Sequence, residues 1–578
     1  MSTNGAKVPP HHSGTTLRSG FPLVRDHAEN ERVSSHLGRY EQVGEVLARH
    51  GLGFLAEVMG VGRWLGNQRA PGADRRDRTT TPVRVRLALE DLGPTFIKLG
   101  QLLSTRSDLL PPAYLTELSK LQDAAPAVPP GDVLDTIRAE LGAGVEELFA
   151  DFDVVPLASA SIGQAHAGHL HDGTPVVVKV RRPGVVAQVE EDLEIVQSLA
   201  RQASRRWERV RGYDLEGIAQ DFAITLRAEL DYLQEGRNAE RFATNFSADP
   251  DVLIPRVIWE RTTSRVLTLE RMTGIKINDL EHLDAAGIDR AAVARRGADM
   301  VLTMIFHDGF FHADPHPGNL FVAPDGSIAL IDFGMVGEVN EQLKDELADF
   351  LIGFTQESPS LLASALYALS VTKDVENRPR LEQSLAGWVS QYAGRPLSEV
   401  RFTHLITQLL AMMREHHLQL PRHMALLFKV LIMVEGLGVQ LDKDFALGEV
   451  LPPYARRLVE DRVSAAAIAQ RVLRASGDAA ELFIELPRRL RRIVETLDTS
   501  GIQIHVRAAE LEPLVGRAER IGNRLVAGMV VAALINGIGG LVVGERKGRS
   551  WVTVLMTAGL SSIGSLVGYL LWTSRRHD

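Results

Sequence analysis

The stretch FHADPHPGNLFV (Phe311–Val322), followed by IDFG (Ile331–Gly334), decides the fold of this chain. It carries a carboxylate at Asp314, an amide at Asn319 and a second carboxylate at Asp332. Each side chain lies beside a short apolar run typical of a buried strand, so all three are expected at strand edges. Carboxylate and amide oxygens are ligands that suit magnesium. The stretch therefore predicts a site for a divalent cation.

Residues upstream of this stretch complete an ordered set of sequence motifs. Transfer of a phosphoryl group from ATP needs a small-residue loop, a strand lysine, a helix glutamate, D-x-x-x-x-N and D-F-G. All five occur here in that order, with Lys179 as the lysine of VVVK. The small-residue loop consists of Ala158, Ser159, Ala160, Ser161, Ile162, Gly163 and Gln164. We expect ATP or ADP with Mg²⁺, with Asp314 facing the reacting phosphate and Asn319 and Asp332 binding the metal.

Taken singly, the motifs also have structural explanations. A D-F-G tripeptide occurs by chance in many proteins, a strand lysine such as Lys179 can extend its stem over apolar surface, and Asp314 can cap a helix. The fixed order of five parts favours phosphoryl transfer. The neighbouring histidines, His307, His312 and His316, lack a regular metal-ligand spacing. We therefore interpret His312 as a residue that packs and hydrogen-bonds within the loop.

Composition narrows the class of protein. The chain has 578 residues, 45% of them hydrophobic, which allows a large core and more than one domain. A net charge of -9 and a pI near 6.1 argue against nucleic acid as a partner. The chain has no cysteine, so disulfides, thiolate zinc sites and cysteine nucleophiles are excluded. The polar N-terminal segment lacks the apolar core of a secretory signal, and we expect the catalytic part in the cytoplasm.

Periodicity predicts an α+β protein with an N-terminal helical extension and a C-terminal two-helix transmembrane hairpin. The order of the five parts is that of protein kinases, so the expected fold between these ends is a bilobal protein-kinase-like fold. Within the β-rich lobe, His171-Asp172-Gly173 predicts a hairpin turn and VLTLERMTGIKI (266–277) a buried strand that leads into a connector. The predicted segments are a disordered polar tail (1–35), the helical extension (36–150), the β-rich lobe (151–275), the helical lobe (276–460), a basic helical linker (461–523) and the hairpin (524–574).

The hairpin prediction rests on two uncharged stretches. Leu525–Val543 and Trp551–Trp572 contain no charged residue, and each is long enough as a helix to cross a hydrocarbon core of about 30 Å. The alternative is a buried hairpin of a soluble fold. Flanking arginines mildly favour cytoplasmic ends, so we expect a two-span protein of the inner or plasma membrane with a cytoplasmic catalytic domain. The arginines in ELPRRLRRIVETL either meet anionic head groups or form a solvated helix face.

Six segments together resemble the AarF/UbiB family of atypical kinases, over roughly residues 40 to 455. They are PTFIKLGQLLSTRSDLLP, PLASASIGQAH, VVVKVRRPG, ELDYLQEGRNAERF, FFHADPHPGNLFV and LIDFGMVG. The resemblance implies a kinase-like fold and an ATPase or atypical kinase that binds nucleotide with magnesium at a membrane. It also implies a role in ubiquinone or isoprenoid-lipid metabolism, with a membrane lipid, such as an isoprenoid or quinone precursor, and lipid-biosynthesis proteins as partners.

The resemblance assigns roles to two further motifs. Lys98, Gly100 and Gln101 match the KxGQ motif of an N-terminal extension that folds over the active site in this family. Glu229 and Asp231 match the ExD motif. Lys98 and Glu229 are therefore candidate catalytic residues, and Gln101 and Asp231 candidate nucleotide-binding residues. A lysine and a glutamine inserted into a phosphate site add positive charge and exclude a bulky acceptor.

The sequence departs from the family pattern at Ser159, which interrupts the usual run of alanines. The hydroxyls of Ser159 and Ser161 are candidates to replace the backbone contacts of a flexible glycine loop, and nucleotide preference stays open. No A-P-E follows D-F-G, so a peptide-docking surface is not expected. The first choice for the ion-pair partner of Lys179 is Glu229. The alternatives are Glu190, Glu191 and Glu194.

Three functions fit these patterns. The first is a membrane-anchored atypical kinase or ATPase that supports quinone or isoprenoid-lipid biosynthesis or transport. The second is a phosphotransferase that acts on a small polar molecule. The third is a nucleotide-sensing membrane scaffold without turnover. The hairpin, the extension over the site and the missing docking surface favour the first.

Overall fold

The computed structural model describes residues 38–53, 80–121, 125–206, 213–371, 378–392, 395 and 399–463, with side chains described up to 460. All of them belong to one compact unit, residues 1–469. The predicted polar tail, transmembrane hairpin and nearly all of the basic linker lie outside the described residues.

A five-stranded antiparallel sheet forms the first lobe, in the order β1-β3-β4-β6 with β2 paired to β3. Its strands are β1 Asp151–Phe152, β2 Ala158–Ser159, β3 Gly163–His169, β4 Pro175–Arg181 and β6 Val266–Glu270. The valines at 176, 178 and 180 of β4 are buried, and Lys179 alternates with them, so its side chain leaves the opposite face of the strand. The predicted turn at His171-Asp172-Gly173 and the buried strand β6 are both confirmed.

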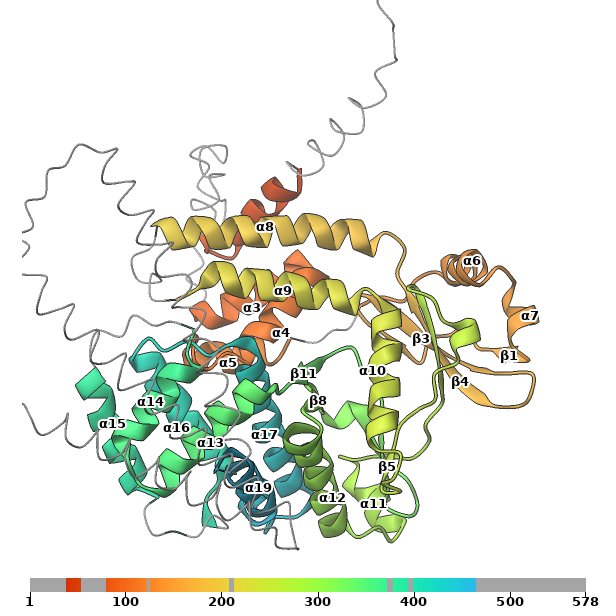
Figure 1. The fold of residues 1–578 in the computed structure, drawn as a ribbon. Helices are drawn as coiled ribbons and strands as arrows, with labels where there is room; N and C mark the ends of the chain where they lie inside the picture. Colours follow the sequence, from red (N-terminus) through yellow and green to blue (C-terminus); the bar gives the residue numbers. More distant parts are fainter. Residues whose placement is uncertain are drawn as a thin grey trace, which may run out of the picture. The chain divides into compact units, whose positions relative to one another are not determined.

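Helices of the N-terminal extension pack on two long helices beside this sheet (Figure 1). The extension comprises helical residues 38–49, α3 Thr81–Leu92, α4 Pro94–Ser104 and α5 Pro112–Leu118, and the long helices are α8 Val185–Arg206 and α9 Leu215–Glu229. Their apolar faces share one core, which includes Phe96 of α4, Leu193 of α8 and Phe222 of α9. Because α4 is part of this core, the KxGQ motif is held rigidly against α9.

Short elements join this layer to the rest of the fold. α6 Pro130–Leu141 and α7 Val145–Leu148 precede the sheet, and α10 Tyr232–Asn245 follows α9. The predicted boundary between the lobes is crossed by two strands. β5 Val252–Leu253 pairs in parallel with β10 Ile328–Leu330, and β7 Ile275–Lys276 pairs with β9 Leu320–Val322. Both therefore belong to the sheet of the second lobe, in the order β5-β10-β9-β7.

The second lobe is mainly helical, and its core is the largest of the described residues. A two-stranded ladder of β8 Phe310–His312 and β11 Val336–Glu338 brackets the two motifs quoted first. The remaining elements are η3 Trp259–Arg261, α11 Leu280–Ala285, α12 Arg290–Leu302, η4 Thr303–His307, η5 Pro317–Asn319, α13 Glu341–Thr355, α14 Pro359–Leu369, α15 Arg378–Ser390, α16 Phe402–Glu415, α17 Arg422–Leu441, α18 Leu447–Val450 and α19 Pro452–Val463.

Helix α17 is the only described helix long and apolar enough to cross a membrane. Most of its apolar window, 61%, is buried in the fold, where the helix packs against α12 and α16. Length and composition alone do not separate a membrane span from the core helix of a lobe. Burial favours the core helix here.

A buried ionic latch joins the extension to the loop before α17. Arg106 and Asp108 form a two-point ion pair, with N–O distances of 2.9 and 2.6 Å, and are only 5% and 1% exposed. Arg106 donates to the Leu420 carbonyl at 3.0 Å, and the Leu420 N–H donates to Asp108 at 3.0 Å. Arg414 donates to the Ser107 carbonyl at 2.8 Å. The latch fixes the extension on the helical lobe.

We predict that Asp108→Ala lowers the free energy of unfolding by about 3–5 kcal/mol, because it leaves the Arg106 guanidinium buried without its carboxylate. Urea denaturation of the purified chain measures this loss. The control is Glu45→Ala, which removes the exposed i,i+4 pair with Arg49 and should cost less than about 1 kcal/mol. Equal losses of unfolding free energy in the two variants would show that the Arg106–Asp108 pair stabilises the protein no more than an exposed ion pair does.

Candidate active site

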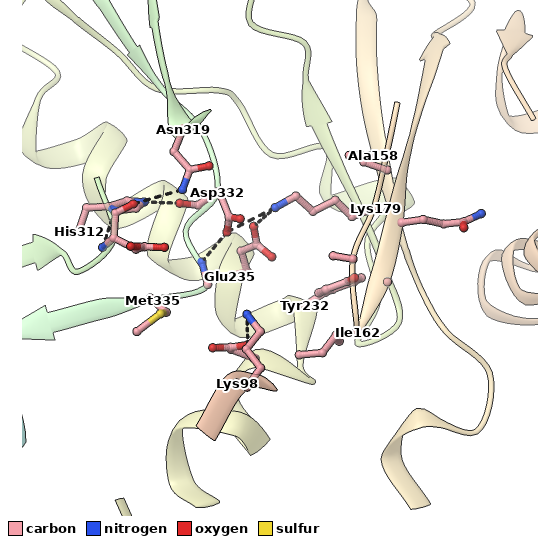
Figure 2. A pocket seen from close by; sticks show the side chains of 17 residues that line it. Lys98, Ala158, Ile162, Lys179, Tyr232, Glu235, His312, Asn319, Asp332 and Met335 are labelled. Atoms are coloured by element: carbon pink, nitrogen blue, oxygen red, sulfur yellow. Dashed lines mark hydrogen bonds and ion pairs between the residues drawn. The ribbon is translucent and has the colours of Figure 1, made fainter. Parts of the chain in front are cut away.

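One cavity of about 220 Å³ lies between the five-stranded sheet, α4, the end of α9, α10 and the two motifs of the second lobe (Figure 2). It is lined by Lys98, Ala158, Ala160, Ile162, Gly163, Gln164, Ala165, Lys179, Glu229, Tyr232, Glu235, His312, Asp314, Asn319, Asp332, Gly334 and Met335. Residues predicted from motifs far apart in the sequence are thus brought together.

Lys179 pairs with a glutamate that the sequence reasoning missed. Its Nζ lies 2.5 Å from Glu235 Oε1 and 3.6 Å from Asp332 Oδ1. The expectation that Glu229 is the partner is wrong, and so are the alternatives on α8, such as Glu190, which pairs with Arg227 at 2.6 Å. Glu235 lies on the buried face of α10, and that helical spacing was the available signal.

Burial and the neighbouring charges together set the pKa values of Lys179, Asp332 and Glu235. Burial by itself lowers the pKa of Lys179, but Asp332 and Glu235 outweigh it and raise that pKa well above its usual value. Lys179 in turn lowers the pKa of Asp332 strongly. Burial raises the pKa of Glu235, against the opposing effect of Lys179. The side chain of Asp332 is 50% exposed, so a charged carboxylate faces the cavity.

The loop after β8 is fixed by hydrogen bonds to its own backbone. Asn319 Nδ2 donates to the Asp314 carbonyl at 3.2 Å, which leaves the amide oxygen available to the cavity (Figure 2). The His312 imidazole accepts from the Asp314 N–H at 3.1 Å and donates to the Asp332 carbonyl. His312 is buried, and burial lowers its pKa. The prediction that His312 packs and hydrogen-bonds is therefore confirmed.

The Asp332 segment is held by α10. Asp332 has a φ of +66°, a left-handed conformation that is uncommon for residues other than glycine. The Phe333 N–H donates to Glu235 at 3.3 Å, and Asn238 Nδ2 donates to the Phe333 carbonyl at 2.9 Å. The Gly334 N–H donates to Asp332 Oδ1 at 3.2 Å. These contacts stabilise the unusual backbone and aim the Asp332 carboxylate at the cavity.

Asp314 also has a charged partner that the motifs did not predict. Lys429 of α17 lies with Nζ 2.7 Å from Asp314 Oδ1. Burial raises the pKa of Asp314, but Lys429, together with His316 and His312, more than offsets this effect, and the pKa falls below its usual value. Asp314 is thus held as a carboxylate.

The small-residue loop is clamped by Arg182. Its guanidinium donates to the Ala160 carbonyl at 2.7 Å and to Ser159 Oγ at 2.7 Å. Ser159 Oγ also donates to the Pro126 carbonyl, and neither Ser159 nor Ser161 lines the cavity. The expectation that serine hydroxyls replace the backbone contacts of a glycine loop is therefore not supported by this geometry. Alanine side chains and the loop backbone form this wall instead.

Gly163 marks the closest approach in this wall. A Cβ atom at this position would lie 2.1 Å from the Tyr232 hydroxyl and 2.7 Å from the Val180 carbonyl oxygen. Backbone at that distance cannot give way cheaply, so only glycine fits. Gln164 lies beside it, with its amide oxygen accepting from the Val128 N–H at 2.9 Å. Gln164 therefore joins the loop to the segment before α6.

The KxGQ and ExD motifs contribute to the site unequally. Lys98 Nζ lies 3.1 Å from Glu229 Oε2, and both side chains line the cavity. Gln101 donates to the Leu121 carbonyl at 3.2 Å, and Asp231 caps α10 by accepting from the Leu233 N–H at 3.1 Å. Gln101 and Asp231 do not line the cavity, so their roles here are in holding α4 and α10.

The oxygen ligands fit a hard cation. Asn319 and Asp332 present one amide oxygen and one carboxylate, the donors that Mg²⁺ accepts. Among the described residues no cluster of three or more His, Asp or Glu side chains could hold a metal. Magnesium usually takes one or two carboxylates and completes its shell with phosphate oxygens and water. The pair therefore fits a cation that arrives with a nucleotide.

The fold and this site define a kinase-like protein, and comparisons with known proteins agree. Residues 120–364 match the ABC1 atypical kinase-like domain, and residues 385–446 match the UbiB helical domain. The chain is therefore a member of the ABC1/UbiB family of atypical kinase-like proteins.

Three similar proteins each match about three quarters or more of this chain. An uncharacterized protein of Synechocystis sp. is 37% identical, over 75% of each chain. A probable protein kinase UbiB of Xylella fastidiosa is 33% identical, over 86% of this chain and 92% of its own length. The chloroplastic protein ACTIVITY OF BC1 COMPLEX KINASE 7 of Arabidopsis thaliana is 34% identical, over 76% of this chain and 64% of that protein.

We predict that Glu235→Gln increases the reactivity of the Lys179 amine toward an amine-selective reagent at pH 9. The substitution removes a carboxylate that raises the pKa of Lys179, and a fall of one unit gives about a tenfold larger neutral fraction. Mass spectrometry of the labelled peptides measures the rate. The matched control is Glu229→Gln, which removes the ion-pair partner of Lys98 and should leave the labelling of Lys179 unchanged. The reverse pattern would restore Glu229 as the partner of Lys179.

Proposed function

We propose that this protein is a membrane-anchored atypical kinase or ATPase that uses Mg-ATP and supports biosynthesis or transport of a quinone or another isoprenoid lipid. One observation carries the proposal. Lys179, Asp314, Asn319 and Asp332, predicted from an ordered set of motifs, line a single cavity. This combination supplies the positioning and charge neutralisation that phosphoryl transfer requires.

Each residue has a role that its environment supports. Lys179 is charged and close enough to two carboxylates to exchange one of them for a phosphate oxygen. Asn319 and Asp332 would hold Mg²⁺, which neutralises the β- and γ-phosphate oxygens when it is bound. Asp314 would orient the acceptor oxygen toward the γ-phosphate. The loop from Ala158 to Gly163 would cover the nucleotide with backbone and methyl groups.

The extension supports a small acceptor or water rather than a protein chain. Lys98 reaches the cavity from α4, which is itself packed on α9, and its pair with Glu229 occupies part of the wall. Opening the site to a peptide would require α4 to leave its core and the latch at Asp108 to break. ATP hydrolysis coupled to another process fits this arrangement best.

The membrane role rests on the sequence outside the described residues. Two uncharged stretches, Leu525–Val543 and Trp551–Trp572, support a two-span anchor in the inner or plasma membrane with the catalytic lobes in the cytoplasm. An anchored nucleotide site has its acceptor or cargo at the bilayer. An isoprenoid or quinone precursor, with lipid-biosynthesis proteins as partners, is the proposed class.

We predict that Asp332→Asn loses most of the thermal stabilisation that Mg-ATP gives to the wild-type protein. A ligand at 100 times its dissociation constant stabilises by about 2.7 kcal/mol, and removing a metal ligand weakens that binding. Thermal denaturation with and without Mg-ATP measures the shift. Asp151→Asn, an exposed position on the first lobe, is the control and should keep the full shift. A full shift in Asp332→Asn would contradict the metal assignment.

We also predict that ATP hydrolysis by the full-length protein rises in the presence of liposomes that contain anionic lipid, and that Asp332→Asn abolishes the rise. Phosphate release with and without liposomes measures this. Turnover only with an added soluble metabolite would favour the small-molecule phosphotransferase. Magnesium-dependent nucleotide binding without any turnover would favour the scaffold.

Removal of residues 525–578 is expected to release the protein from membranes, because it deletes both uncharged stretches. Ultracentrifugation of cell membranes followed by detection of the chain measures this. The control is the full-length protein with Arg488, Arg489, Arg491 and Arg492 changed to Gln, which should still sediment. A truncated chain that still sediments, together with release of the Gln variant, would assign the anchoring to the arginines.

A further inference from the structure

The catalytic loop contains no lysine or arginine, yet its carboxylate is paired with a cation. The stretch from Phe310 to Val322 has histidines as its only basic residues. Lys429 supplies the charge from α17, 115 positions away in the sequence, with Nζ at 2.7 Å from Asp314 Oδ1. Neither the ordered motifs nor the roles proposed above account for this lysine.

Lys429 sits in a position where a charge is costly. Its neighbours in the helix, Phe428 and Val430, are buried in the core of the second lobe. The Lys429 side chain is only 20% exposed and that of Asp314 only 30%. A lysine with so little access to water needs a partner, so an apolar residue would be the simpler choice for packing alone. The pair therefore points to a requirement at Asp314.

The carboxylate of Asp314 has few other restraints. Asn319 and His312 bind the Asp314 backbone, through its carbonyl and its N–H, and these two bonds do not involve its carboxylate. Among the described residues, His316 is the only other partner of the carboxylate, at 3.9 Å from Oδ2. Lys429 does not line the cavity, whereas Asp314 does. Lys429 therefore acts on the site through Asp314.

We propose that Lys429 is a positioning residue for phosphoryl transfer, which holds Asp314 Oδ1 so that Oδ2 faces the acceptor oxygen. The inference rests on the proposed function. In that step the acceptor oxygen bonds to the γ-phosphorus, and the bond from that phosphorus to the bridging oxygen breaks with its electron pair on ADP. The acceptor proton hydrogen-bonds to Oδ2 and passes to solvent.

The position of Lys429 also couples the helical lobe to both sides of the site. Helix α17 carries Lys429, and the Leu420 backbone just before it holds Asp108 of the extension. A displacement of α17 would therefore release the Asp314 carboxylate and the latch of the KxGQ extension together. The UbiB helical domain match ends at residue 446 and includes this helix.

The test is a double-mutant cycle on the full-length protein in anionic liposomes, with ATP hydrolysis as the readout. We expect Lys429→Met to lower kcat about tenfold or more, while the KM for ATP and the thermal shift with Mg-ATP change less than about twofold. In the Asp314→Asn background Lys429→Met should have no further effect on kcat, because the group it orients is already altered. Lys429→Arg should recover part of the lost rate.

Lys443→Met is the matched control, since Lys443 is exposed just beyond the end of α17 and should leave kcat and KM unchanged. If Lys429→Met does not fold, Lys429→Gln takes its place in the cycle. An unchanged kcat in the Lys429 variant, an equal loss in the presence and absence of Asp314, or a change confined to KM would overturn the positioning role. Absence of turnover in the wild-type protein would instead contradict the proposed function, and the inference with it.

Discussion

The site depends on the cost of burying the Lys179 ammonium. A charge in a cavity between two lobes must be balanced by carboxylates, and Glu235 and Asp332 supply them at 2.5 and 3.6 Å. Meeting this requirement brings β4, α10 and the segment after β10 together. The same Glu235 accepts the Phe333 N–H, so the glutamate that balances the lysine also orients the segment that carries Asp332. Glu235 therefore balances the charge of Lys179 and also fixes the backbone beside Asp332.

Two further lysine–carboxylate pairs lie around this group. Lys98 and Glu229 form another, partly buried pair, contributed by α4 and the end of α9. The extension that carries Lys98 is attached to the helical lobe through Asp108. Lys429 and Asp314 form a third pair from that lobe. Three lysines from three parts of the chain thus meet carboxylates in or beside one cavity. Because each pair joins different elements, the three pairs together hold α4, β4, α10 and α17 around the cavity.

Much of this arrangement could be predicted, and the parts that could not share a cause. Lys179, Asp314, Asn319 and Asp332 were found because each belongs to a short motif whose order is fixed by the chemistry. Helical spacing places Glu235 on the buried face of α10 but does not identify Lys179 as its partner, and no local pattern connects Lys429 with Asp314, because both contacts depend on how distant elements pack. Ser159 illustrates the same point, since its hydroxyl is taken by Arg182, a residue of another strand end. The capping role of Asp231 is a local contact with the Leu233 N–H, two residues on, which a helix-capping rule predicts.

The most direct measurement is a structure determined with a non-hydrolysable ATP analogue and Mn²⁺ in place of Mg²⁺, so that anomalous scattering locates the cation. We predict the α- and β-phosphates at Lys179, the cation bound by Asn319 and Asp332, and Asp314 Oδ2 directed at the γ-phosphate. A nucleotide bound outside the cavity, or a cation that neither Asn319 nor Asp332 contacts, would contradict the assignment.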